Sequence, residues 1–121
     1  MQKMLIIDDA AVNRLLLAEI YRQEFEVLLA ENGRDGLRVL EETPDIAVVI
    51  LDLAMPEMGG LQATRLIKAQ DNPPFIVIAS HFDDAEHREH ALRAGADGFV
   101  SKLSYIQEVL AILEKLHGET P

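Results

Sequence analysis

The sequence predicts a single α/β domain in which helices cover both faces of a parallel five-stranded sheet. Short apolar runs alternate with amphipathic helical patterns along all 121 residues, and the connections between them are short. The apolar runs are continuous, as expected of parallel strands that are buried on both faces. The length suits one domain over residues 1–121, of which only residues 118–121 are expected to form a loose tail.

The first unit is expected to comprise a strand over residues 3–8 and a helix over residues 10–23. The strand is predicted by its apolar run. The helix is predicted by apolar residues spaced four apart, which would form one buried stripe. The expected stripe is Val12, Leu16 and Ile20, and the polar residues expected outside it are Asn13, Arg14, Arg22 and Gln23.

The second and third units repeat this pattern, with strands expected over residues 26–30 and 47–51. Asn32 has a side chain suited to an N-cap, so a second helix is expected from there to about Glu42. A third helix is expected from about Gly60 to Ala69. The positions expected to face inward are Leu37 and Leu40 in the second helix and Ala63, Leu66 and Ile67 in the third.

The last two units begin after Pro73 and Pro74, with a strand expected over residues 75–80. Asp83 and Glu86 have the spacing of a capping box, which predicts a helix that continues to Ala94 and is closed by Gly95. A fifth strand is expected over residues 98–101. Ser104 and Gln107 repeat the capping-box spacing before a last apolar stripe, which consists of Ile106, Val109, Leu110 and Leu113.

The composition excludes several classes of function. The formal net charge is −10, from 21 acidic residues against 11 Lys and Arg, so direct binding to a nucleic-acid backbone is disfavoured. The sequence contains no apolar run of the roughly 18 residues that cross a membrane and no signal peptide. Because there is no cysteine, disulfides and thiolate sites are excluded. These features favour a cytoplasmic protein that does not bind membranes.

Residues suited to chemistry stand at the carboxyl ends of the first, third, fourth and fifth predicted strands. Carboxylates follow the first and third strands, a hydroxyl ends the fourth and an amine follows the fifth; these residues are Asp8, Asp9, Asp52, Ser80 and Lys102. In open parallel sheets, ligands bind beyond the carboxyl ends of the strands. The sequence therefore predicts that these side chains converge at one edge of the sheet.

The chemistry of this set suggests phosphoryl transfer. Clustered carboxylates repel one another unless a cation lies among them, and an all-oxygen cluster suits Mg²⁺. A carboxylate can also act as a nucleophile and form an aspartyl phosphate, provided that cationic groups neutralise the transferred oxygens. Asp52 is the predicted acceptor, with Lys102 as the cation and Ser80 as a hydrogen-bond donor.

The chain resembles the receiver domain of two-component response regulators, the CheY-like family, along essentially its whole length. The resemblance rests on the order and spacing of "LIIDDA", "ILDLAMPEMGG", "VIAS" and "GADGFVSK". It implies a doubly wound, flavodoxin-like (βα)5 fold with the strand order 2-1-3-4-5.

The resemblance also implies a role for each matching residue. Asp52 would be the phosphoacceptor and a metal ligand. The other Mg²⁺ ligands would be Asp9 directly, Asp8 largely through water, and the backbone carbonyl of Ala54. Ser80 and Lys102 would contact the phosphoryl group, and Ser80 and the aromatic residue Phe99 would form the switch.

The implied function is a phosphorelay switch. The phosphoryl donor would be a histidine kinase or a histidine phosphotransfer protein that docks near Asn13 and Arg14. Phosphorylation would remodel the surface formed by the fourth helix, the fifth strand and the fifth helix. The partner that binds this surface could be a second copy of the chain or an output domain. Such a chain is not a turnover enzyme, although it contributes to its own phosphorylation and dephosphorylation.

The chain departs from the usual pattern of the family in three ways. Leu103 replaces the proline that usually follows the lysine, so the Lys102–Leu103 bond is expected to be trans, because a non-proline cis bond costs about 2.5–4 kcal/mol. His81 replaces a small residue and could narrow access to Asp52 or titrate near the phosphoryl group, or point to solvent. Ala54 and Phe82 offer no polar group to orient water, which predicts slow self-dephosphorylation.

Other functions fit less well. A receiver-like interaction module that signals without phosphorylation remains the alternative, since His81 and Leu103 are unusual. A haloacid dehalogenase-type phosphatase needs a second acid two residues after the nucleophile, where this chain has Ala54. A flavodoxin-type cofactor site would need a hydroxyl-rich loop after the first strand. His87 and His90 share a helical face, but solvated histidines are commoner than a metal pair.

Overall fold

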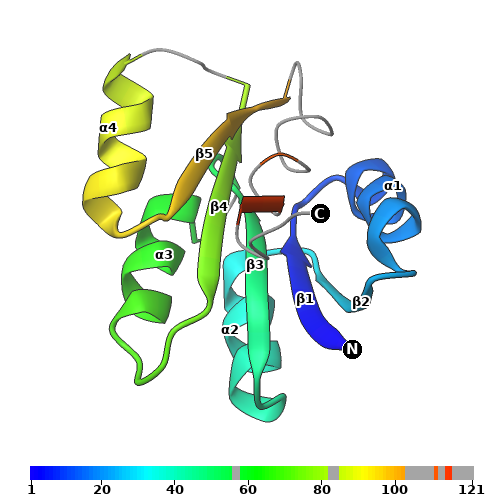
Figure 1. The fold of residues 1–121 in the computed structure, drawn as a ribbon. Coiled ribbons are helices and arrows are strands. Elements are labelled where there is room, and N and C mark those ends of the chain that lie inside the picture. The colour runs from blue at the N-terminus through cyan, green and yellow to red at the C-terminus, as the bar shows by residue number, and fades with distance from the viewer. Residues whose placement is uncertain (56–57, 82–84, 103–110, 112–113, 116–121) are drawn as a thin grey trace.

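The computed structural model describes residues 1–55, 58–81, 85–102, 111 and 114–115. Within them, five parallel strands form one sheet in the order β2-β1-β3-β4-β5 (Figure 1). The strands are β1 (Gln2–Ile7), β2 (Phe25–Ala30), β3 (Ile46–Asp52), β4 (Phe75–Ser80) and β5 (Gly98–Ser101). The predicted α/β class and strand order are both confirmed.

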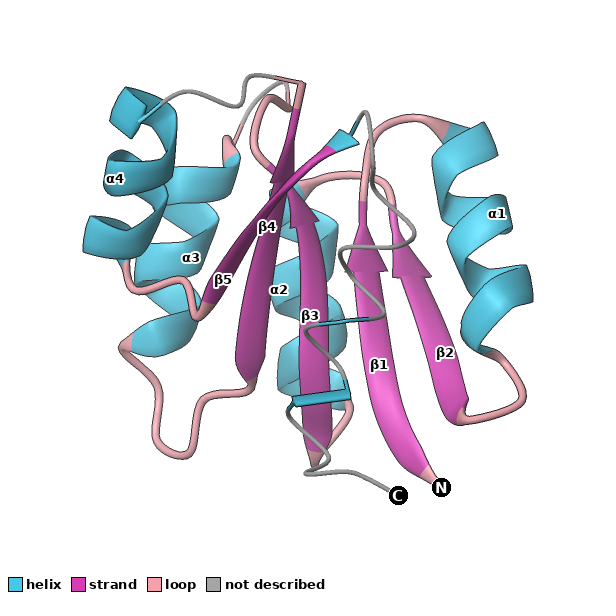
Figure 2. Cartoon of the chain, turned by 45° about the horizontal axis from the view of Figure 1, so that its top comes forward, coloured by secondary structure: helices cyan, strands magenta, loops and turns pink. Residues whose placement is uncertain are grey.

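Four helices connect these strands on the two faces of the sheet. They are α1 (Ala11–Tyr21), α2 (Gly33–Glu42), α3 (Gly60–Lys68) and α4 (Ala85–Ala94). Figure 2 shows α1 on one face of the sheet and α2, α3 and α4 on the other. Most of the predicted fifth helix, the capping residues Asp83 and Ser104 and the expected tail lie outside the described residues.

The sheet separates two apolar layers, each formed by alternate residues of the central strands. Met4 and Ile6 of β1 pack on the α1 side, whereas Leu5 and Ile7 pack on the side of α2, α3 and α4. All four of these side chains are fully buried. Burial on both faces explains why the strand sequences are continuous apolar runs.

Of the predicted buried stripe of the first helix, Ile20 packs against the core, but the predictions for Val12 and Leu16 are wrong. Val12 and Leu16 are 75% and 49% exposed, and the buried residues of α1 are instead Leu17 and Tyr21. Three consecutive leucines over residues 15–17 allow more than one apolar stripe, so the i+4 spacing alone did not fix which face is buried. The third helix buries Ala63 and Ile67 as predicted, but Leu66 is 43% exposed.

Two predicted helix ends are confirmed by backbone geometry. The Asn32 side chain caps α2 by accepting a hydrogen bond from the Asp35 amide at 2.8 Å. Gly95 follows α4 with a φ of 109°, a left-handed conformation that favours glycine.

An ion pair ties α3 to the segment before β5, at the amino end of the sheet. Lys68 Nζ lies 2.6 Å from Asp97 Oδ2 and also donates to the Pro74 carbonyl at 2.9 Å. The same Asp97 oxygen accepts from the Ile76 amide of β4 at 2.8 Å. Among the described helices, none is long and apolar enough to cross a membrane.

Candidate functional site

The carboxyl ends of β1 and β3 place two buried carboxylates side by side. Ile7 pairs with Leu51 in the parallel register, so Asp8 and Asp52 emerge from neighbouring strands at the same level. Asp8 is fully buried, Asp52 is 4% exposed and Asp9 is exposed. One carboxylate oxygen from each of the three residues lies within 4.8 Å of the others.

Lys102 bridges the two buried carboxylates. Its ammonium lies 3.2 Å from Asp8 Oδ2 and 3.0 Å from Asp52 Oδ1, and its side chain is only 6% exposed. The predicted convergence of β1, β3 and the end of β5 on one edge of the sheet is therefore present in the structure.

Residues of α1 and of the turn before it hold Asp8 in place. Asp8 Oδ1 accepts from the Ala10 amide at 2.9 Å, and Oδ2 accepts from the Asn13 side chain at 3.3 Å. Arg14 donates from Nη1 to the Asp8 main-chain carbonyl at 2.6 Å. From the sequence, Asn13 and Arg14 are expected only as part of a docking surface. Their spacing of four and three residues from Leu17 could have placed them on the inner face of the helix.

The main chain around Asp52 is fixed by close packing against the start of α3. The Leu53 amide donates to the Ala79 carbonyl, and the Gly60 amide donates to the Leu53 carbonyl, both at 2.8 Å. A Cβ atom at Gly60 would lie 2.5 Å from the Asp52 carbonyl oxygen. Glycine is therefore required where α3 meets the end of β3.

Two of the three carboxylates, those of Asp9 and Asp52, line a cavity of about 260 Å³ at the carboxyl edge of the sheet, and Asp8 lies buried beneath it. Its lining residues lie in α1 and at or just beyond the carboxyl ends of β1, β3, β4 and β5: Asp9, Ala10, Asn13, Asp52, Ala54, Ser80, His81 and Lys102. Ser80 is buried, whereas Ala54 and His81 are exposed.

Phe99 does not line this cavity. It is 5% exposed and belongs to the apolar layer on the side of α2, α3 and α4. Phe82 and the Lys102–Leu103 bond lie outside the described residues, so the predictions for them remain predictions.

The site makes ionisation of Asp52 less favourable than that of a free aspartate. Burial is the main reason that the pKa of Asp52 is raised from 3.8 to about 6. Contact with Lys102 lowers this pKa, while Asp8 and Asp9 raise it. Burial lowers the pKa of Lys102, but Asp52 and Asp8 more than offset this effect, so the pKa of the ammonium is raised.

The donor set fits a hard divalent cation. Three carboxylates within 4.8 Å of one another offer only oxygen ligands and carry more negative charge than one lysine neutralises. Mg²⁺ prefers such oxygen ligands and keeps several waters, for which the cavity provides room. In the part of the chain that the structure describes, no other group of three or more His, Cys, Asp or Glu side chains could hold a metal.

Comparison with protein families matches residues 4–114 to the response regulator receiver domain. The chemotaxis protein CheY of Listeria monocytogenes is 37% identical over 118 residues, covering 95% of this chain and 98% of that protein. CheY of Halobacterium salinarum is 36% identical over 103 residues, or 84% of each chain. The oxygen regulatory protein NreC of Staphylococcus epidermidis is 36% identical over 124 residues, which span 98% of this chain and 56% of that protein.

Solved structures show the same similarity. A response regulator receiver domain protein from Clostridium thermocellum has a TM-score of 0.85 and 28% identity, with 97% of this chain and 95% of that chain covered. The BeF3-activated receiver domain of DrrB has a TM-score of 0.86 and 25% identity, with 97% of both chains covered. The chain therefore belongs to the family of response regulator receiver domains, the signalling modules of two-component systems.

Proposed function

We propose that Asp52 accepts a phosphoryl group from a histidine kinase or a histidine phosphotransfer protein. The observation that supports this proposal is the arrangement of Asp8, Asp52 and Lys102, with contacts of 3.2 and 3.0 Å between the ammonium and the two carboxylates. With a pKa of about 6, Asp52 is largely ionised at pH 7 and can act as a nucleophile.

In the transfer step, an Asp52 carboxylate oxygen attacks the phosphorus atom. A P–O bond to Asp52 forms while the P–N bond to the donor histidine breaks, and the histidine nitrogen keeps the bonding electron pair. The Lys102 ammonium neutralises charge on the transferred oxygens, and the Ser80 hydroxyl donates a hydrogen bond to one of them. Asp9, Asp52 and the Ala54 carbonyl would hold Mg²⁺, with Asp8 acting largely through water. The ion would supply further charge neutralisation.

The phosphoryl group would favour one of two conformations of the protein. Ser80 would move toward a phosphoryl oxygen and Phe99 would occupy its inward position, which would alter the surface formed by α4, β5 and the predicted fifth helix. Phosphorylation acts here only through a difference in stability between the two states. A partner protein, an output domain or a second copy of the chain would recognise this surface.

The donor protein is expected to dock on α1. Asn13 and Arg14 are half-buried and bound to Asp8, so they are not the main contact surface. The exposed apolar side chains beside them are Val12, Leu15 and Leu16, which are 75%, 64% and 49% exposed. Docking through these residues would place the donor histidine above the cavity that contains Asp52.

Incubation with Mg²⁺ and acetyl phosphate, followed by measurement of the intact mass, tests the proposal. The wild-type chain is expected to gain one phosphoryl group, and the gain should be lost in Asp52→Asn and without Mg²⁺. If the folded wild-type chain gains no phosphoryl group and also fails to bind beryllofluoride, a phosphoryl analogue, the proposal is wrong. A phosphorylation-independent interaction module would then be the better function.

The cavity lining also suggests a long-lived aspartyl phosphate. Ala54 is exposed at the cavity and has no polar side chain to orient water, and His81 occupies the same rim. The sequence places a second apolar residue, Phe82, next to His81. We expect Phe82→Asn to lose its phosphoryl group by hydrolysis faster than wild type does, because asparagine can orient water. We expect His81→Ala to be phosphorylated faster by acetyl phosphate, because the imidazole no longer narrows access to Asp52. Timed mass spectra measure both rates, and unchanged rates would contradict these roles.

A further inference from the structure

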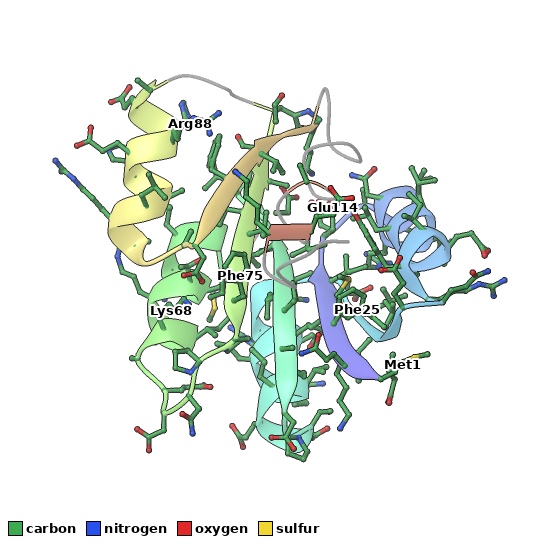
Figure 3. The ribbon with its side chains drawn as sticks, in the orientation of Figure 1. Met1, Phe25, Lys68, Phe75, Arg88 and Glu114 are labelled. Carbon is green, nitrogen blue, oxygen red and sulfur yellow. The ribbon has the colours of Figure 1, made fainter. Side chains whose placement is uncertain are left out.

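Arg88 of α4 lies directly over the ring of Phe99. The central carbon of its guanidinium is 4.8 Å from the ring centroid, a distance typical of a cation–π interaction. Arg88 Nη1 also donates a long hydrogen bond, 3.4 Å, to the main-chain carbonyl of Phe99. In Figure 3 the Arg88 side chain extends from α4 toward β5.

The two contacts depend differently on the orientation of the ring. The hydrogen bond reaches the main chain of β5, so it can hold the guanidinium in place whichever rotamer Phe99 adopts. The cation–π contact requires the ring to lie in its present position, where the residue is 5% exposed. Turning the ring outward about its Cα–Cβ bond would remove the ring face from beneath the cation. The contact therefore favours the buried rotamer over an outward one.

We propose that Arg88 is a positioning residue that holds Phe99 in its buried rotamer and thereby increases the affinity of the domain for a phosphoryl group at Asp52. This inference rests on the proposed function, in which the phosphoryl group favours inward Phe99. Linkage is reciprocal: if the ligand favours the buried ring, a contact that favours the buried ring must favour the ligand. Arg88 itself does not reach the cavity around Asp52.

The same helix offers a matched control. Arg93 lies on α4 in an exposed i,i+4 ion pair with Glu89, 2.6 Å away, and its side chain is 73% exposed. Replacing either arginine with methionine removes one positive charge and keeps a long side chain. Only Arg88→Met removes the cation from the ring of Phe99.

Titration with beryllofluoride in saturating Mg²⁺ measures the effect on affinity. Arg88→Met is expected to weaken beryllofluoride binding by about two- to fivefold, the range of a half-exposed cation–π contact. Its affinity for Mg²⁺ alone should match wild type, and Arg93→Met should match wild type in both titrations. Loss of Mg²⁺ affinity in Arg88→Met would indicate general damage to the site and would overturn the proposal.

The rotamer of Phe99 gives a second readout that does not depend on phosphorylation. Side-chain scalar couplings in a phenylalanine-labelled sample report the populations about its Cα–Cβ bond. Arg88→Met should increase the outward population of Phe99, and an unchanged population would overturn the proposal. If the wild type fails to bind beryllofluoride, the proposed function fails, whereas this measurement still tests the contact between Arg88 and Phe99.

A double-mutant cycle assigns the effect to the ring. In a Phe99→Leu background the side chain remains apolar but has no aromatic face, so Arg88→Met should no longer change beryllofluoride affinity. An equal loss in both backgrounds would contradict the proposal. Thermal unfolding establishes that each variant is folded. If Arg88→Met does not fold, Arg88→Gln takes its place, and the expected results are the same.

Discussion

At the scale of single residues, Asp52 is a buried carboxylate that ionises less readily in the folded chain than a free aspartate does. It is 4% exposed, and its contact with the Lys102 ammonium is shared with the carboxylate of Asp8. Burial and two neighbouring carboxylates raise its pKa despite that contact. A site that concentrates negative charge in this way is suited to bind a cation, and it lowers the stability of the ligand-free fold.

The pKa of Asp52 predicts a pH-dependent gain in stability for Asp52→Asn. Because this pKa is about 6 in the folded chain and 3.8 for an unperturbed aspartate, the folded chain retains the Asp52 proton more strongly than the unfolded chain does. The stability contributed by this proton is fully present below about pH 4 and is lost as the pH rises through about 6. We therefore expect Asp52→Asn to unfold at higher urea than wild type at pH 7, by an amount on the order of 1–2 kcal/mol.

The comparison requires metal-free buffer and urea unfolding at several pH values from about 4 to 7. The difference between Asp52→Asn and wild type should shrink toward zero at the acidic end. Asp71→Asn, at an exposed position outside the cavity, makes the same charge change and should show no such gain. If Asp52→Asn raised the free energy of unfolding by the same amount at every pH, the ionisation of Asp52 would not be the cause, and the prediction would be wrong.

At the scale of secondary structure elements, the junction between β3 and α3 determines where Asp52 lies. The first residue of α3, Gly60, packs against main-chain atoms at the end of β3: an added Cβ would lie 2.5 Å from the Asp52 carbonyl oxygen and 2.8 Å from Leu53 Cα. Backbone atoms cannot move aside as a flexible side chain can. The absence of a side chain at Gly60 therefore lets α3 hold the strand end that carries Asp52.

This packing predicts that Gly60→Ala lowers the free energy of unfolding by about 1–3 kcal/mol, the usual effect of overpacking. The added methyl should also displace Asp52 and slow phosphorylation by acetyl phosphate. Gly59→Ala is the matched control, because among the described residues its Cβ would meet only the Leu53 carbonyl oxygen, at an ordinary 3.6 Å. Chemical denaturation of both variants checks the prediction, and equal stabilities would contradict it.

The strands could be predicted from sequence more fully than the first helix. Five apolar runs, read with the rule that ligands bind at the carboxyl ends of parallel strands, were sufficient to bring Asp8, Asp52 and Lys102 together. The buried face of α1 could not be predicted, because the leucines over residues 15–17 give several equally good stripes. Asn13 and Arg14 reach Asp8 only because α1 lies in this orientation, so their contacts with Asp8 could not be predicted either.

The contact between Arg88 and Phe99 shows a different limit. It joins α4 to β5 across eleven residues of sequence and depends on the rotamer of a long side chain. No periodic pattern of residues encodes such a pairing. Hydrophobic patterning thus predicts layers and strand ends, whereas contacts between individual polar side chains require the packed structure.

At the scale of the whole molecule, negative charge is spread over the whole surface and is also concentrated in one cluster of carboxylates. The net charge of −10 opposes compaction through repulsion over the whole surface, and three of the acidic side chains meet at one edge of the sheet. Any salt screens the repulsion between charges spread over the surface. Only a cation that binds to the cluster of Asp8, Asp9 and Asp52 relieves the repulsion among these three carboxylates. The two effects can be separated by comparing Mg²⁺ with a monovalent salt at equal ionic strength.

We therefore expect Mg²⁺ to raise the melting temperature more than NaCl does at the same ionic strength. A ligand at a hundredfold excess over its Kd adds about 2.7 kcal/mol to stability, which corresponds to a rise of several degrees for a chain of this size. Asp9→Asn should lose the extra rise, because it removes a ligand from the cluster. Asp71→Asn changes the net charge equally and lies outside the cluster, so it should keep the extra rise. Equal shifts from the two salts in the wild type would mean that Mg²⁺ acts only by screening, and the cluster would then not be a metal site.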